Sequence, residues 1–272
     1  MTQPVNRRGR RSATPGGWRQ TVQVLPNAAG AAARAAELFV ESAAGAIKAR
    51  NRFNVALAGG NTPRAMYTLL ADETRFDVDW PHVDVFFTDE RCVPPDDQAS
   101  NYRMAAEALL GHVNVCSNCV HRMEGEYGAA AAAARYESVL RDHFADDDDR
   151  FDFVLLGMGV DGHTASLFPG TEGLQVTDAW CHGSPVPALD TERVTLTYRS
   201  INAARRIVFL VTGSAKAVTL CEVLTGPVEV ERLPAQGVRP TDGDLFWIAD
   251  AEAAASLPTA FRGEQCEKGF SH

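Results

Sequence analysis

An aspartate and a histidine separated by one glycine are the residues of this sequence best suited to acid–base chemistry. They are Asp161 and His163, and they follow the apolar run that begins at Phe151. An imidazole exchanges protons near neutral pH, and a neighbouring carboxylate can fix which ring nitrogen carries the proton. His163 could instead cap the following helix, but catalytic groups gather on loops of this kind. We therefore predict that His163 is a general base and that Asp161 orients it.

The same stretch contains the spacing of a dinucleotide-binding loop, because Gly157, Gly159 and Gly162 spell G-x-G-x-x-G. That fingerprint requires a long helix directly after the glycines and then a second strand that ends in an acid. Here Pro169 interrupts the chain within two turns, and no predicted strand runs into Asp178. The pattern therefore does not predict a dinucleotide site.

A second glycine-containing loop precedes a helix that we expect to begin near Pro63. It contains Gly59, Gly60, Asn61 and Thr62. Glycines allow the backbone to approach an anion, and a helix N-terminus presents unpaired N–H groups to it. A tight turn capped by Thr62 would be the structural alternative. The loop lacks the lysine of a triphosphate-binding P-loop, so a phosphate or a sugar hydroxyl is the expected ligand.

Charged side chains end the next apolar strand, in the segment "FFTDERCVP". Asp89 and Arg91 lie there, and Asn101 follows in "SNYRM". Charges at a strand end often only mark its exit into solvent. Arginine, however, can bind a phosphate or a developing oxyanion through two hydrogen bonds. We expect Arg91 in the site, Asp89 to orient it, and the amide of Asn101 to bind a sugar hydroxyl.

Two further cations are candidates for anion binding. Lys216, in "GSAKA", falls in the first turn of a predicted helix, where its charge opposes the helix dipole. That position is favourable if both the lysine and the helix end face an anion. Arg193, which opens "RVTLTY", could join it there, although a strand-edge arginine is usually only solvated.

The loops require a scaffold, and strand-like and helix-like segments alternate along the chain. Helices are predicted at 28–49, from 63, near 101–110, at 128–144 and at 214–224, and strands from 53, at 83–89, and from 151, 193, 206 and 245. Strands that are apolar on both faces indicate an α/β fold with a mostly parallel sheet covered on both sides. Ligands of such folds bind at the carboxyl ends of the strands, where all these loops fall.

Composition excludes several classes of function. The net charge of −9 opposes general nucleic-acid binding, and no apolar run approaches the roughly 20 residues of a membrane-spanning helix. Six cysteines without a disulfide framework, and no signal peptide, predict a reduced, cytoplasmic setting. Cys116 and Cys119, with His121 nearby, resemble half of a zinc site, but no second ligand pair follows at zinc spacing, so we expect no metal.

The chain organisation predicts one folded unit between two tails. Residues 1–19 are basic and rich in small polar residues, which predicts a disordered tail; a transit peptide is the less favoured interpretation. Residues 20–262 should form a single α/β catalytic domain, and 263–272 a short C-terminal tail. We expect a monomer or a small homo-oligomer.

Taken together, the loop motifs resemble the 6-phosphogluconolactonase family. The motifs are "GGNTP", "DERCVP…SNYRM", "GMGVDGHTASLFP", "ERVTLT", "GSAKA" and the closing "LFWIADAEAA", in this order over roughly residues 20–260. The resemblance implies a Rossmann-like three-layer fold, similar to that of glucosamine-6-phosphate deaminase and ribose-5-phosphate isomerase. It also implies hydrolysis of 6-phospho-D-glucono-1,5-lactone in the oxidative pentose phosphate pathway, without a cofactor.

The resemblance also assigns roles to the loop residues. His163 would be the general base and Arg91 a cation near the lactone, while the "GGNTP" loop, Arg193 and Lys216 would hold the phosphate or neighbouring hydroxyls. The related deaminases share similar loops but carry a glutamate five residues after the loop histidine, where this chain has Phe168.

The alternatives are therefore a glucosamine-6-phosphate deaminase and a non-catalytic sugar-phosphate sensor. Phe168 and Arg91 disfavour the deaminase, because the deaminases read "DEY" or similar where this chain has Arg91. A sensor of the transcription-regulator type would need a DNA-binding module, which the first 20 residues cannot form.

Overall fold

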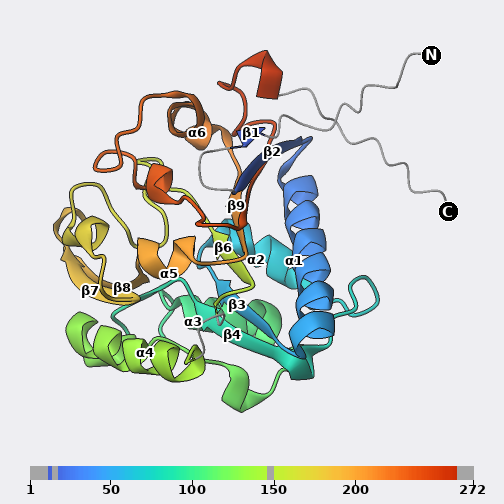
Figure 1. Ribbon diagram of the computed structural model, residues 1–272, viewed down its shortest axis with the longest axis vertical. Helices are drawn as coiled ribbons and strands as arrows, with labels where there is room; N and C mark the ends of the chain where they lie inside the picture. Colours follow the sequence, from blue (N-terminus) through green and yellow to red (C-terminus); the bar gives the residue numbers. More distant parts are fainter. Residues whose placement is uncertain (1–11, 14–17, 146–149, 262–272) are drawn as a thin grey trace.

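A seven-stranded sheet forms the centre of the protein (Figure 1). The structure is a computed structural model and describes residues 12–13, 18–145 and 150–261. In spatial order the strands are β1 (Ser12–Ala13), β2 (Arg19–Leu25), β10 (Asp244–Asp250), β9 (Arg206–Val211), β6 (Phe153–Leu156), β3 (Phe53–Leu57) and β4 (Val83–Phe87). Neighbouring strands are parallel except for the pair β1–β2. The predicted mostly parallel sheet is confirmed.

Helices connect and cover these strands. They are α1 (Ala28–Arg50), α2 (Asn61–Leu70), α3 (Asn101–Ala105), which continues as a π-helical turn (Ala106–Leu110), α4 (Ala129–His143), α5 (Tyr198–Asn202) and α6 (Ala217–Thr225). Short 3₁₀ turns lie at Trp80–His82, Ser117–Cys119, Gly125–Tyr127, Glu172–Gln175, Pro187–Leu189, Ser214–Lys216, Pro234–Gly237 and Thr259–Phe261. The helix predicted at 214–224 is thus a 3₁₀ turn followed by α6.

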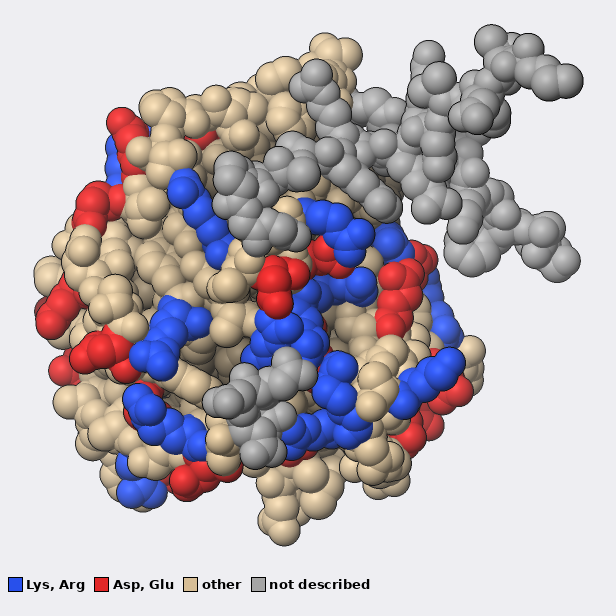
Figure 2. All heavy atoms as spheres, in the orientation of Figure 1, with Lys and Arg blue, Asp and Glu red and all other residues tan. Residues whose placement is uncertain are grey.

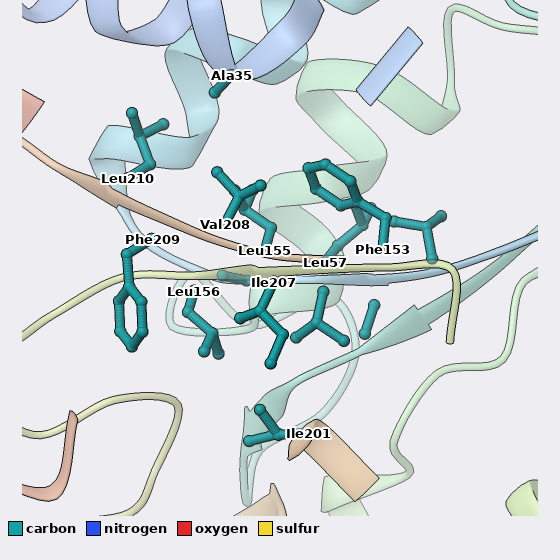
Figure 3. Close-up of a cluster of buried hydrophobic side chains, with 14 of the residues drawn as sticks. Ala35, Leu57, Phe153, Leu155, Leu156, Ile201, Ile207, Val208, Phe209 and Leu210 are labelled. Atoms are coloured by element: carbon teal, nitrogen blue, oxygen red, sulfur yellow. The ribbon is translucent and has the colours of Figure 1, made fainter. Parts of the chain in front are cut away.

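Both faces of the sheet are buried, which explains why its strands lack a polar face. Figure 3 shows Ala35 of α1 above the sheet, and Ile201 of α5 below it. Along β9 the side chains alternate between the two layers, with Val208 on the α1 side and Ile207 on the α5 side. All these residues are fully buried. The core therefore fixes the direction of each central strand, and with it the position of the loop that follows.

A second, three-stranded sheet lies beside the first and was not foreseen. It consists of β5 (Asp89–Arg91), β8 (Thr191–Leu196) and β7 (Cys181–Val186), all antiparallel. The strand predicted from Arg193 exists, but it begins at Thr191 and belongs to this sheet, against which α4 packs (Figure 1). Its pairing partner β5 has only three residues, too few to produce a recognisable period in the sequence.

The ends of the chain lie largely outside the described residues. In the predicted basic tail, Ser12 and Ala13 pair with Gln20 and Arg19 of β2, and the rest of residues 1–17 is not described. The tail predicted at 263–272 also lies outside the described residues. Among the described helices, none combines the length and apolarity of a membrane span.

Charged side chains are unevenly distributed in spite of the acidic net charge. Figure 2 shows Lys and Arg gathering near the centre of the view, with Asp and Glu interspersed.

At the amino-terminal edge of the sheet, buried Asp152 accepts a hydrogen bond from the Asn54 backbone and forms ion pairs with Arg50 and Arg205. These ion pairs brace the end of the sheet that is remote from the predicted site loops.

Candidate active site

One cavity lies at the carboxyl ends of the central strands, as the fold predicts. Its volume is about 500 Å³, which is suitable for a small metabolite. Loops after β3, β6 and β9 line it, together with β5 and β8. All the predicted site residues line this cavity: Gly59, Gly60, Asn61, Thr62, Asp89, Arg91, Asn101, Asp161, His163, Arg193 and Lys216.

Asp161 and His163 form a hydrogen-bonded pair in the loop after β6. Nδ1 of His163 lies 2.6 Å from Oδ1 of Asp161, and the His163 backbone N–H donates to the same oxygen at 3.2 Å. The His163 side chain is 31% exposed, so it remains accessible to a ligand in the cavity. With Nδ1 directed at a carboxylate, the ring would present an unprotonated Nε2 as a base.

Gly159 makes room for this pair. Its N–H donates to the His163 carbonyl at 2.8 Å, which closes the loop. A Cβ at this position would lie 2.1 Å from Nδ1 of His163 and 2.3 Å from Oδ1 of Asp161. The glycine spacing that resembles a nucleotide fingerprint therefore includes a residue required by the Asp161–His163 pair.

The environment keeps Asp161 ionised. Partial burial by itself would raise the pKa of Asp161, but the hydrogen bond and charge of His163, together with backbone N–H groups, bring that pKa below its ordinary value. At neutral pH the carboxylate therefore remains negative. A negative Asp161 stabilises the imidazolium that forms when His163 accepts a proton.

Arg91 and Arg193 are direct neighbours in the second sheet, because they are register partners on the adjacent strands β5 and β8. Burial, and then the charge of Arg91, lowers the pKa of Arg193. Two guanidinium groups repel one another at such a position unless an anion lies between or beside them. The pair therefore forms one cationic side of the cavity.

Lys216 forms a second cationic position, in the 3₁₀ turn before α6. Burial lowers the pKa of Lys216, and the charge of Asp161 partly restores it. The α2 N-terminus adjoins this turn, because the Thr62 and Thr212 hydroxyl oxygens are 3.1 Å apart. Lys216 and the N-terminus of the ten-residue helix α2 together indicate an anion-binding position at this side of the cavity.

Asp89 and Asn101 have partners other than those we expected. Asp89 does not orient Arg91 in the described contacts, because its Oδ2 accepts a hydrogen bond from Ser166 at 2.7 Å. The Asn101 amide donates to the Asp89 carbonyl at 2.9 Å, and its Oδ1 would overlap a Cβ at Gly59. The amide is therefore held against the loop and is 3% exposed, which leaves little surface for a sugar hydroxyl. Sequence reasoning missed Ser166, although it lies within the quoted "HTASLFP".

Glu90 was also missed, and it organises the loop from β5 to α3. Its carboxylate accepts backbone N–H groups of Arg91, Asn101 and Tyr102 at 2.7–2.8 Å, and the Ser100 hydroxyl at 3.0 Å. Burial raises the pKa of Glu90 above its ordinary value, and the three backbone donors offset only part of that rise. Since Ser100 also caps α3, the two polar side chains together fix where that helix begins.

We predict that Glu90→Gln lowers the free energy of unfolding by about 1–3 kcal/mol, because the amide nitrogen would face backbone donors that then lose an acceptor. Urea denaturation measures this change. Exposed Glu107, which pairs with Arg64 and Arg103, gives the matched control Glu107→Gln, with a much smaller effect expected. Equal effects of the two substitutions would show that Glu90 does not organise the loop.

Phe168 packs against the catalytic candidate from the same loop. The two ring centroids of Phe168 and His163 are 4.3 Å apart, at an interplanar angle of 33°. An aromatic ring limits the orientations of the imidazole and offers it no proton. At this position the chain therefore presents an apolar contact and no second acid.

The fold and the cavity define an α/β protein with an acid–base pair and an anion-binding region at the carboxyl edge of its sheet. Comparison with known proteins gives the family. Residues 26–247 match the family described as glucosamine-6-phosphate isomerases/6-phosphogluconolactonase. The chain belongs to this family.

Individual relatives agree with that assignment. A 6-phosphogluconolactonase of Nostoc sp. is 38% identical over 248 residues, covering 88% of this chain and 99% of the relative. The solved 6-phosphogluconolactonase of Trypanosoma brucei superposes with a TM-score of 0.75 at 27% identity, covering 88% of this chain and 99% of the other. A monomeric glucosamine-6-phosphate deaminase superposes with a TM-score of 0.72 at 21% identity, covering 86% of this chain and 99% of the other. This similarity shows a shared fold.

Proposed function

We propose that this protein hydrolyses 6-phospho-D-glucono-1,5-lactone to 6-phospho-D-gluconate. The observation that carries the proposal is the Asp161–His163 pair, 2.6 Å between Oδ1 and Nδ1, in a cavity that also contains Arg91, Arg193 and Lys216. A base and a cationic region are what water attack on a phosphorylated lactone requires. The relatives named 6-phosphogluconolactonase support the same substrate.

In the proposed mechanism, His163 activates a water molecule. Nδ1–H donates to Asp161, so Nε2 accepts a proton from the water as its oxygen attacks C1 of the lactone. The tetrahedral intermediate carries a negative charge on the former carbonyl oxygen. The oxyanion then re-forms a carbonyl, the bond between C1 and the ring oxygen breaks, and the ring oxygen takes the proton back from His163. The resulting carboxylic acid loses its proton to solvent, and 6-phosphogluconate is released.

Cationic side chains bind the substrate in this proposal. Lys216, Arg193 and the N–H groups at the start of α2 hold the phosphate, and Arg91 stabilises the oxyanion. Arg91 suits that role because it is the cross-strand neighbour of Arg193 and can act on an adjoining part of the same substrate. Asp89 and Asn101 shape the wall of the cavity between these groups.

Freshly generated lactone, assayed beside glucosamine 6-phosphate, tests the function. We expect turnover of the lactone above its spontaneous hydrolysis and no release of ammonia from the amine. Turnover of the amine alone would identify a deaminase. Tight binding of 6-phosphogluconate without turnover would identify a sensor.

The lowered pKa of Lys216 predicts a pH dependence of binding. Because the protonated amine attracts phosphate, affinity for the product 6-phosphogluconate should fall as pH rises through that pKa, below the range of an ordinary lysine. Lys216→Arg keeps its charge and should remove this alkaline loss. Isothermal titration calorimetry between neutral and alkaline pH measures both. An identical loss in the arginine variant would show that another group titrates.

The cellular setting belongs to the proposal as well. Five described cysteines, Cys92, Cys116, Cys119, Cys181 and Cys221, are free thiols, which supports a reduced, cytoplasmic location. The proposed partner is the sugar-phosphate lactone alone, without nucleic acid, and the protein is proposed to act as a monomer or small homo-oligomer.

A further inference from the structure

Two histidines and an aspartate meet at the amino-terminal edge of the large sheet, away from the active-site cavity. Asp84, His121 and His143 each present a ligand atom, and these atoms all lie within 4.8 Å of one another. Nε2 of His121 is 3.1 Å from Oδ1 of Asp84. Asp84 is the second residue of β4, whereas the cavity begins beyond the last residue of that strand.

Three separate parts of the fold bring these side chains together. Asp84 lies beside Asn54, its register partner on β3. The His121 backbone N–H donates to the Val85 carbonyl at 2.8 Å, so its segment runs alongside β4. His143 comes from the last turn of α4, and its Nε2 lies 2.8 Å from Oδ1 of Asn54.

Packing holds both imidazoles in place. The His121 ring stacks on Phe86, with centroids 4.4 Å apart, and the His143 ring meets the same phenyl ring edge-on at 4.9 Å. The Asp84 and His121 side chains are each 20% exposed, so the cluster is shielded without being sealed. Ligands held by packing and by second-shell hydrogen bonds lose little freedom when a metal binds.

We propose that Asp84, His121 and His143 form a binding site for a divalent transition-metal ion such as Zn²⁺. Two neutral imidazoles and one carboxylate are a ligand set that zinc accepts, and that Mg²⁺ and Ca²⁺, which prefer oxygen, do not. Of the three residues, His121 lines a cavity of about 550 Å³, which opens this side of the site to solvent. The site would join the edge strand β4 to the end of α4, so its role is structural.

The "CSNC" segment, Cys116 to Cys119, lies close to this proposed metal site. Cys119 lies near enough to Asp84 for the carboxylate charge to contribute, after burial and a hydrogen bond with Cys116, to a raised pKa of the Cys119 thiol. The core of the site is nevertheless the set of three residues, since their ligand atoms form the compact group. Substitution of Cys116 and Cys119 therefore distinguishes zinc bound by the three-residue set from zinc bound by the cysteines.

Tag-free full-length protein, dialysed against EDTA and then titrated with ZnCl₂, tests the proposal. We expect one zinc per chain by elemental analysis, a higher melting temperature with zinc, and affinity weakened about 100-fold or more in Asp84→Asn and His121→Gln. Circular dichroism of the zinc-free variants verifies that they fold. His143→Gln should behave like His121→Gln.

Matched controls define the outcomes. His82 pairs with Asp79 at 3.0 Å and belongs to no group of three possible ligands in the described part of the chain, so His82→Gln should retain binding. His163→Ala should retain it too, which separates this cluster from the active-site pair. Absence of stoichiometric binding overturns the proposal. So does binding that survives His121→Gln but is lost in the double substitution Cys116→Ser and Cys119→Ser.

Discussion

His163→Ala should reduce kcat for lactone opening by about 10²–10⁴-fold, the contribution of a general base. Without the imidazole, only water can accept the proton as the attack proceeds. KM should change much less, because the phosphate-binding groups remain. The measurement is a coupled assay of freshly generated lactone with the spontaneous hydrolysis subtracted.

Exposed His112, which bonds the Glu107 backbone carbonyl and does not line the cavity, gives the control substitution His112→Ala. It should keep the unaltered kcat. A kcat of His163→Ala that also stays near the parent value would remove His163 from the base role. The base would then have to be sought among the carboxylates of the cavity, such as Asp89.

The positions of the site loops were predictable because one physical rule connects sequence to space. Carboxyl ends of parallel strands meet at one edge of a sheet, and the strands of this chain are recognisable as apolar runs. Gly59, His163 and Lys216 follow three different strands, and the structure brings all three to one cavity. Nothing beyond strand assignment and parallel order was needed for that inference.

The contacts between loops were not predictable in the same way. Arg91 pairs with Arg193 through a short antiparallel sheet whose register depends on tertiary packing. The expected Asp89–Arg91 contact was inferred from closeness in sequence, and residues two apart on a strand do share a face. The Arg91 guanidinium nevertheless donates to the Ala99 carbonyl of the following loop, a contact that strand periodicity does not reveal. Asp89 instead reaches Ser166, which is 77 residues away.

The Asp84–His121–His143 cluster shows the same limit at the other edge of the sheet. Sequence reasoning searched for zinc ligands at short, regular spacing around Cys119. The ligands that meet in space are 37 residues apart for Asp84 and His121, and they come from different elements. The pairing of the His121 segment with β4, the register of β3 with β4 and the end point of α4 place them together.

Gly159→Ala should reduce kcat by about 100-fold or more, because displacement of a catalytic group by about 1 Å can cost that much. The new methyl group would overlap Nδ1 of His163 and Oδ1 of Asp161. Both are atoms of side chains that can rotate, so the pair should separate while the backbone keeps its path. The protein should remain folded and bind 6-phosphogluconate with little change.

Gly157→Ala provides the control within the same loop, since a Cβ there meets nothing within 4 Å. It should keep kcat, whatever its effect on KM. If Gly159→Ala kept its kcat as well, the hydrogen bond between Asp161 and His163 would not be needed for catalysis. A loss of kcat in Gly159→Ala alone, with unfolding unaffected in urea, would instead tie the rate to the geometry of that pair. This substitution thus tests the arrangement of the two groups while leaving both of them in the protein.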